Sequence, residues 1–109
     1  MSTFVIKRGD TLPYITATLL EGVAAVDLTG ATVNFVMKRA ATGCAPAIVL
    51  RKPVVVLNAL TGSVRYEWAA GDTAAAGQYR GEFEISIGGR VVTHPTTGFI
   101  PITIVADLG

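Results

Sequence analysis

Apolar and polar residues alternate with a period of two along most of this chain, which is the pattern of half-buried β-strands. The alternation is clearest between Gly62 and Ile87, where two such stretches flank a short alanine-rich segment. In both stretches one face is apolar and aromatic, and the other carries arginine, glutamate and serine. The same pattern elsewhere completes the set of residues that we expect in the core: Val33, Phe35, Met37, Val64, Tyr66, Trp68, Phe83 and Ile85.

Turn-forming residues recur at short intervals, which favours a β-sandwich over alternating strands and helices. Pro53 is expected at a sheet edge or a bulge, and Pro101 at an edge or in a strand that switches partners, because proline cannot donate a ladder hydrogen bond. The pattern predicts an all-β sandwich in one domain, residues 1–109. Beyond the two clearest strands, the expected strands cover residues 4–6, 14–20, 31–38, 47–50, 54–57, 91–93 and 99–106.

The alanine-rich segment 69–77 joins the two clearest strands. Its alanines are good helix formers and Asp72 is a good N-cap, so a single helical turn ending at Gly77 is expected there. Tyr79 begins the next strand, where the tyrosine of a tyrosine corner bonds back to the upstream backbone. We therefore expect Asp72, Gly77 and Tyr79 to form a structural corner.

The chain carries little charge for its size. Only 16% of its residues are charged, against about 25% in an average globular domain, and the mean hydropathy is +0.51. Large exposed apolar patches are uncommon on monomers, so we expect other subunits to cover part of this surface; the alternative is a monomer with an unusually apolar surface. The residues expected at that assembly interface are Phe4, Val5, Val36, Val49 and Val55.

The distribution of charge argues against two classes of partner. The formal net charge is +1 and the basic residues occur as scattered pairs, so no nucleic-acid partner is expected. The longest uncharged run, 91–106, contains two prolines and several threonines, so no membrane span is expected. The N-terminal apolar stretch is too short for a secretory signal, which predicts synthesis and folding in a cytoplasm.

Residues capable of catalysis are few and isolated. The single cysteine, Cys44, excludes an intrachain disulfide, and the single histidine, His94, precedes a proline and is expected at a strand end or in a loop. Glu82 and Glu84 alternate with core residues as a solvated face does, and Arg8-Gly9-Asp10 is explained by a turn. We expect no catalytic residue, no cofactor and no metal, so the protein is not expected to be an enzyme.

A family resemblance adds to this picture, and it covers nearly the whole chain. The residues that carry it are Asp27-Leu28-Thr29-Gly30, the strand around Phe35, and then Trp68, Asp72, Gly77, Tyr79 and Phe83 in that order. In these features the chain resembles the N-terminal domain family of phage upper baseplate proteins. The resemblance implies an immunoglobulin-like antiparallel β-sandwich of about seven strands, used as an attachment module in a virion.

Upper baseplate proteins of that family continue into further domains with receptor-binding parts, whereas this sequence ends at Gly109. We therefore expect the docking part alone: a multi-copy structural subunit of a phage tail or baseplate that contacts other phage structural proteins and copies of itself. Capsid decoration or a head-tail connector is the alternative location. A free carbohydrate-binding sandwich is a third hypothesis, and it would require an exposed aromatic platform.

Overall fold

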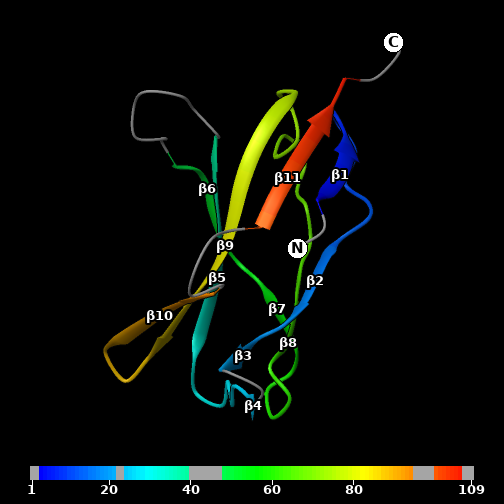
Figure 1. The fold of residues 1–109 in the computed structure, drawn as a ribbon. Helices are drawn as coiled ribbons and strands as arrows, with labels where there is room; N and C mark the ends of the chain where they lie inside the picture. The colour runs from blue at the N-terminus through cyan, green and yellow to red at the C-terminus, as the bar shows by residue number, and fades with distance from the viewer. Residues whose placement is uncertain (1–2, 22–23, 40–47, 95–99, 107–109) are drawn as a thin grey trace.

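The structure is a computed structural model that describes residues 3–21, 24–39, 48–94 and 100–106. These residues form strands and turns and contain no helix, so none of them forms a helix that could cross a membrane. Figure 1 shows the strands as two layers. The strands are β1 (Phe4–Lys7), β2 (Ile15–Thr18), β3 (Leu20–Glu21), β4 (Ala24–Ala25), β5 (Thr32–Arg39), β6 (Ile48–Pro53), β7 (Val55–Asn58), β8 (Ser63–Tyr66), β9 (Gly77–Ile87), β10 (Arg90–His94) and β11 (Ile100–Val105).

The larger sheet is built around β9, the longest strand. Its order is β1-β11-β9-β5-β6, and β10 also pairs with β9. β5 lies along one side of β9, from Thr32 opposite Ser86 to Arg39 opposite Tyr79. On the other side β11 pairs with the first half of β9 and β10 with the second half. β9 therefore holds together strands from the middle and the end of the chain.

The second layer is a three-stranded sheet of order β2-β8-β7, next to which β3 and β4 form a small hairpin. The chain changes layers between β6 and β7, at Val54, whose backbone N–H donates to the carbonyl of Val33 at 3.1 Å. Pro53 is the last residue of β6, which is the edge strand of the larger sheet. Because β6 is an edge strand, the N–H that proline lacks is not needed for hydrogen bonds to strands on both sides.

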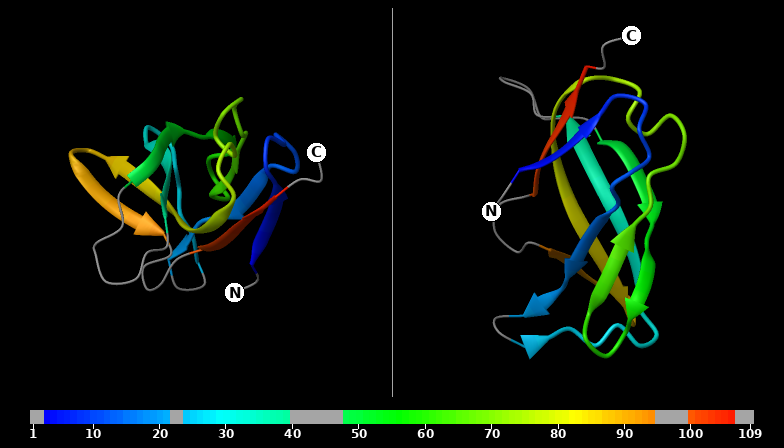
Figure 2. Two further views of the ribbon diagram at one scale, coloured as in Figure 1. Left: turned by 90° about the horizontal axis from the view of Figure 1, so that it is seen from above. Right: turned by 90° about the vertical axis from the view of Figure 1, so that its right-hand side faces the viewer.

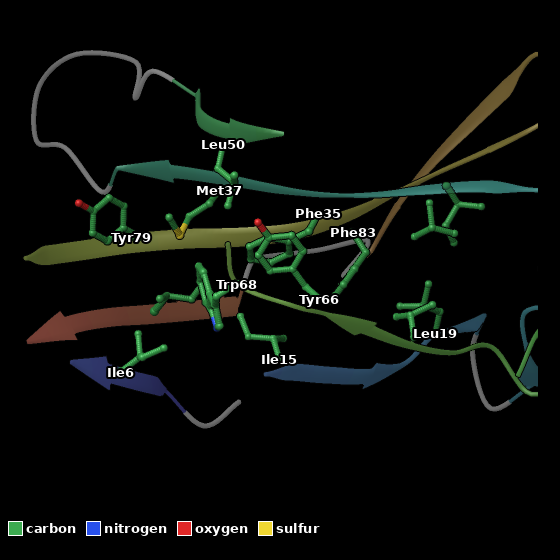
Figure 3. Packing of buried hydrophobic residues seen from close by; sticks show 14 of the residues in the cluster. Ile6, Ile15, Leu19, Phe35, Met37, Leu50, Tyr66, Trp68, Tyr79 and Phe83 are labelled. Carbon is green, nitrogen blue, oxygen red and sulfur yellow. The ribbon is translucent and has the colours of Figure 1, made fainter. Parts of the chain in front are cut away.

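Aromatic side chains fill the space between the two layers (Figure 3). The ring of Phe35 lies 4.7 Å from that of Tyr66, 5.4 Å from that of Phe83 and 5.9 Å from that of Trp68, measured between centroids. All eight residues expected in the core are buried there. Such offset and tilted ring pairs add to the stabilisation from apolar burial, so this cluster is the centre of the fold.

The expected all-β sandwich is confirmed, but two details differ. The described residues form eleven strand segments instead of about seven; the stretch 14–20 divides into β2 and β3, and β4 is added beside β3. β1 pairs with β11 in parallel, while the other pairings among the described strands are antiparallel. The immunoglobulin-like arrangement stays a prediction.

Of the two positions expected for Pro101, the edge strand is wrong. β11 lies between β1 and β9, so it is an interior strand. Its pairing with β1 begins only at Ile102, opposite Phe4, and Pro101 precedes it. The proline is tolerated because the β1 ladder has not yet begun at that position.

Candidate functional site

The corner between β8 and β9 is closed by the hydroxyl of Tyr79. This hydroxyl donates to the backbone carbonyl of Ala75 at 2.7 Å and accepts from Nη1 of Arg39 at 2.9 Å. The guanidinium of Arg39 also lies over the Tyr79 ring, 5.3 Å from its centroid. Gly77 has φ +153°, and a Cβ there would lie 3.1 Å from Nη2 of Arg39. The phenol thus bonds back to the upstream backbone, as a tyrosine corner requires.

Asp72 belongs to a different hydrogen-bond network from the one that we expected. Its carboxylate does not bind Tyr79; it accepts hydrogen bonds from the Tyr66 hydroxyl, from the backbone N–H of Ala69 at 2.8 Å and from Nζ of Lys52 at 2.7 Å. Tyr66 ends β8 and Lys52 belongs to β6, so the carboxylate joins the loop to both sheets.

The surroundings of Asp72 and Tyr66 shift the pKa values of both side chains. Burial alone would raise the pKa of Asp72, but the hydrogen bonds from Lys52, Tyr66 and Ala69 outweigh it and hold that pKa below its ordinary value. Burial, followed by the hydrogen bond to Asp72 and its negative charge, raises the pKa of the Tyr66 phenol. Asp72 is therefore held ionised and Tyr66 protonated, which are the forms that this hydrogen bond needs.

No helical turn forms between 69 and 77. The segment consists of turns, and Gly71 lies at φ +91°, outside the helical region. Asp72 directs its carboxylate back to the N–H of Ala69 instead of capping a helix that follows. The helix propensity of the alanines is outweighed by these local and tertiary bonds.

Thr73 is a structural position that the sequence pattern did not reveal. Its side chain is buried, and its hydroxyl donates to the carbonyl of Asp10 at 2.8 Å and accepts from the N–H of Gly9 at 3.1 Å. Gly9 and Asp10 form the turn that was expected from Arg8-Gly9-Asp10, with Gly9 at φ +85°. The hydrogen bonds of Thr73 fix this turn to the loop between β8 and β9. The position of Thr73 next to Asp72 in the sequence is the one signal that could have singled this threonine out.

The residues expected at an assembly interface fall into different environments. Val5 and Val55 are exposed, and Phe4 is half-buried with its ring 6.0 Å from that of Trp68. The side chain of Val49 lies outside the described residues. Val36 was wrongly assigned, because only 3% of it is exposed. It points away from the core, but Arg51 and Glu82 flank it on the neighbouring strands, and the stems of such long side chains cover apolar neighbours.

Of the two candidates for chemistry, the structure describes only His94. Cys44 lies outside the described residues. His94 ends β10 as expected, but it is buried opposite Phe83 and is not an exposed loop residue. Within the described part of the chain no group of three or more histidine, cysteine, aspartate or glutamate side chains could hold a metal ion.

A polar hollow of about 360 Å³ lies beside the corner. Its cationic lining is already engaged: Lys52 binds Asp72, Arg51 binds Glu84, and Arg39 binds Tyr79. These pairs are explained by the stability of the fold, and they leave no arrangement of acid, base and nucleophile in the hollow.

Two apolar grooves of about 410 and 330 Å³ lie side by side between β2 and β11. They share Ala17 and Ile100; Phe4 and Tyr14 line the first groove, and Leu19 and His94 are among the residues that line the second. Outside these grooves, apolar side chains are exposed on β7 and on the β9–β10 hairpin. The exposed apolar surface of the described residues is therefore concentrated in these grooves, on β7 and on the β9–β10 hairpin.

Comparisons with known proteins agree with this fold. The family model described as the BppU N-terminal domain matches residues 5–100. Among solved structures, the N-terminal domain of ORF48 of phage TP901-1 is similar, with a TM-score of 0.63 and 16% sequence identity over 97% of this chain and 85% of that chain. At this identity the likeness concerns the fold alone. No curated protein sequence matches.

The family match covers most of the chain and includes the corner, the aromatic core and both sheets except β11 beyond Ile100. The family is that of the phage baseplate upper protein. This chain therefore belongs to the BppU N-terminal domain family.

Proposed function

We propose that this chain is a non-enzymatic docking subunit that is present in several copies in the tail or baseplate of a phage virion. The observation that carries the proposal is the match to the BppU N-terminal domain over residues 5–100. Membership in a phage baseplate domain family supports a structural role in the tail or baseplate and contacts with other phage structural proteins. We further propose that residues 1–109 act as one domain, assembled in the host cytoplasm.

The surface of the domain supports docking in several copies. Ten large apolar side chains are exposed among the described residues, on a chain in which 16% of residues are charged. Ion pairs do not compensate, since the salt bridges Arg51–Glu84, Lys52–Asp72 and Arg65–Glu67 in the described part of the chain each include a cation whose side chain is at least one third exposed. Exposed pairs of this kind contribute about 0 to 1 kcal/mol each, so apolar contacts would dominate assembly.

Carbohydrate binding is disfavoured by the placement of the aromatic residues. Trp68, Tyr66 and Tyr79 are buried, and each is explained by the core or the corner. The half-buried ring of Tyr14 is covered by Arg65, whose Cζ lies 5.0 Å from the ring centroid. The described residues thus offer no flat, exposed aromatic platform of the kind on which a sugar ring stacks.

Antibody labelling of purified particles tests the proposal. Antibodies against this chain should label the tail or the baseplate in electron micrographs. Label on the head or the neck would favour the alternative location, as a capsid decoration or a head-tail connector. Particles that carry no label, although the antibody binds the purified chain, would contradict a structural role in the virion.

A further inference from the structure

The polar hollow beside the corner is lined by three cations and one carboxylate: Arg39 at the end of β5, Arg51 and Lys52 on β6, and Asp72 in the loop between β8 and β9. The right-hand view of Figure 2 shows this loop, in yellow-green, at the end of the domain where β5 ends and β6 begins. The lining has a formal net charge of +2, whereas the whole chain has only +1. Positive charge is therefore concentrated in this hollow.

The single carboxylate of the lining cannot neutralise all three cations. The side chain of Asp72 is 5% exposed and already accepts three hydrogen bonds, one of them from Lys52. Arg51 is paired with Glu84, which does not line the hollow. Arg39 is therefore the cation of the lining that has no carboxylate partner among the described residues.

Arg39 is nevertheless held in one orientation. Its Nη1 donates to the Tyr79 hydroxyl at 2.9 Å and its Nη2 to the carbonyl of Ala76 at 3.3 Å, and both acceptors are uncharged. A guanidinium carries five N–H groups, so further donors remain. The segment 40–47 lies outside the described residues, and its sequence contains no aspartate or glutamate that could act as the counter-ion. An arginine whose orientation is already fixed loses less conformational entropy when it binds an anion.

We propose that this hollow binds a carboxylate side chain from an acidic segment of another phage structural protein. Arginine is enriched where proteins bind carboxylates, because its planar guanidinium offers several N–H groups in a fixed arrangement. Arg39 provides these hydrogen bonds, and Arg51 and Lys52 add positive charge beside it. Complementary charge of this kind adds specificity to a contact that apolar side chains stabilise.

The choice of a carboxylate over a phosphate follows from the rest of the chain. The basic residues are scattered along the sequence and do not form the stripe that follows a nucleic-acid backbone. The partner in the proposed function is a protein, and the anionic side chains of proteins are carboxylates. The inference deepens the proposed docking role, on which it rests, by naming the chemistry of the partner.

Titration of the purified chain with a hexaglutamate peptide at low ionic strength tests the inference. Hexaglutamate should shift the NMR signals of backbone amides that line the hollow, such as those of Gly71 and Ala74. Hexaglutamine is the uncharged control and should leave these signals unchanged. Raising the salt concentration should weaken the binding, because the side chains of Arg51 and Lys52 are partly exposed and their charges are screened.

Two variants assign the binding to the hollow. Arg39→Gln removes the charged hydrogen-bond donor and should weaken hexaglutamate binding about tenfold or more. Because Arg39 also supports the corner, Arg51→Gln is the second variant: it removes positive charge from the lining, leaves the hydrogen bonds of Tyr79 in place, and should also weaken the binding. Arg65→Gln is the matched control. Arg65 is likewise paired with a glutamate, but it belongs to β8 and does not line the hollow, so this variant should bind as tightly as wild type.

Absence of hexaglutamate binding, or a loss in Arg65→Gln equal to that in Arg51→Gln, would overturn the site. Tighter binding of inorganic phosphate than of hexaglutamate would overturn the assignment of a carboxylate. If a chain that antibodies locate in the baseplate does not bind hexaglutamate, the inference fails and the proposed function stands. Hexaglutamate binding by a chain that is absent from particles would support the site and contradict the proposed function.

Discussion

The hydroxyl of Tyr66 donates a hydrogen bond to the carboxylate of Asp72 and so ties the aromatic core to the loop between β8 and β9. The same carboxylate accepts from Lys52 and from the N–H of Ala69. The side chain of Asp72 is 5% exposed, whereas that of Lys52 is 44% exposed. One acidic side chain thus fixes the loop that carries both the corner and Thr73.

Asp72→Ala should lower the free energy of unfolding by about 2 to 3 kcal/mol, because a buried phenol and a backbone N–H lose their acceptor. Glu67→Ala is the matched control. Glu67 is an exposed carboxylate that pairs with Arg65, so its loss should cost about 0.5 kcal/mol or less. Urea unfolding of both variants checks this, and equal losses would show that Asp72 is not a structural centre.

The Tyr66–Asp72 pair should also shape the pH dependence of stability. The lowered pKa of Asp72 stabilises the fold above the ordinary value of 3.8, and this contribution is lost as the pH falls through the folded value. The raised pKa of Tyr66 acts in the opposite sense: its contribution is complete below 10.0 and is lost as the pH rises above it.

Urea unfolding from pH 2 to 11 should therefore show two flanks that report on this pair. Tyr66→Phe should flatten the alkaline decline, and Asp72→Asn should flatten part of the acid decline. An alkaline decline that is equally steep in wild type and Tyr66→Phe would mean that the phenol is not buried against Asp72.

Tyr79→Phe should cost about 1 kcal/mol, and up to about 2 because the Ala75 carbonyl and Arg39 both lose their partner. Phe83→Ala removes a core ring and should cost about 3 to 5 kcal/mol. Glu82→Ala, one residue away on the outward face, should cost little. Comparable losses at Phe83 and Glu82 would contradict the two-faced structure of β9.

Gly81→Ala should destabilise the fold by about 1 to 3 kcal/mol by overpacking the core. A Cβ at this position would lie 2.7 Å from Cδ1 of Ile102 and 3.0 Å from the ring of Phe35. Ile102→Val removes that Cδ1, so the double variant should lose less stability than the sum of the two single variants. Strict additivity would show that Gly81 is not in close contact with Ile102.

The local pattern predicted the strands and their buried faces because apolar and polar residues alternate along each half-buried strand. The inward phases of β5, β8 and β9 could be read in this way, and so could the position of Tyr79 at the start of β9. The parallel pairing of β1 with β11 could not, since it joins the two ends of the chain and depends on the whole sheet. The change of layer at Val54 is a tertiary feature of the same kind.

The misassigned residues share a cause. The alternation of β5 places Val36 on the outward face, but alternation within one strand does not show which long side chains flank this valine on the neighbouring strands. His94 was expected at a strand end or in a loop because it precedes a proline, and the register opposite Phe83 makes this strand end a buried one, which the sequence pattern did not show. Thr73 is a small polar loop residue, and its value depends on the distant turn at Gly9 that it binds.

Quantitative mass spectrometry of purified virions, with heads and tails separated, tests the central claim most directly. Peptides of this chain should be found with the tail fraction and in several copies per particle, as expected of a docking subunit. Recovery with the heads would contradict a tail or baseplate position, and absence from both fractions of intact particles would contradict the structural role itself.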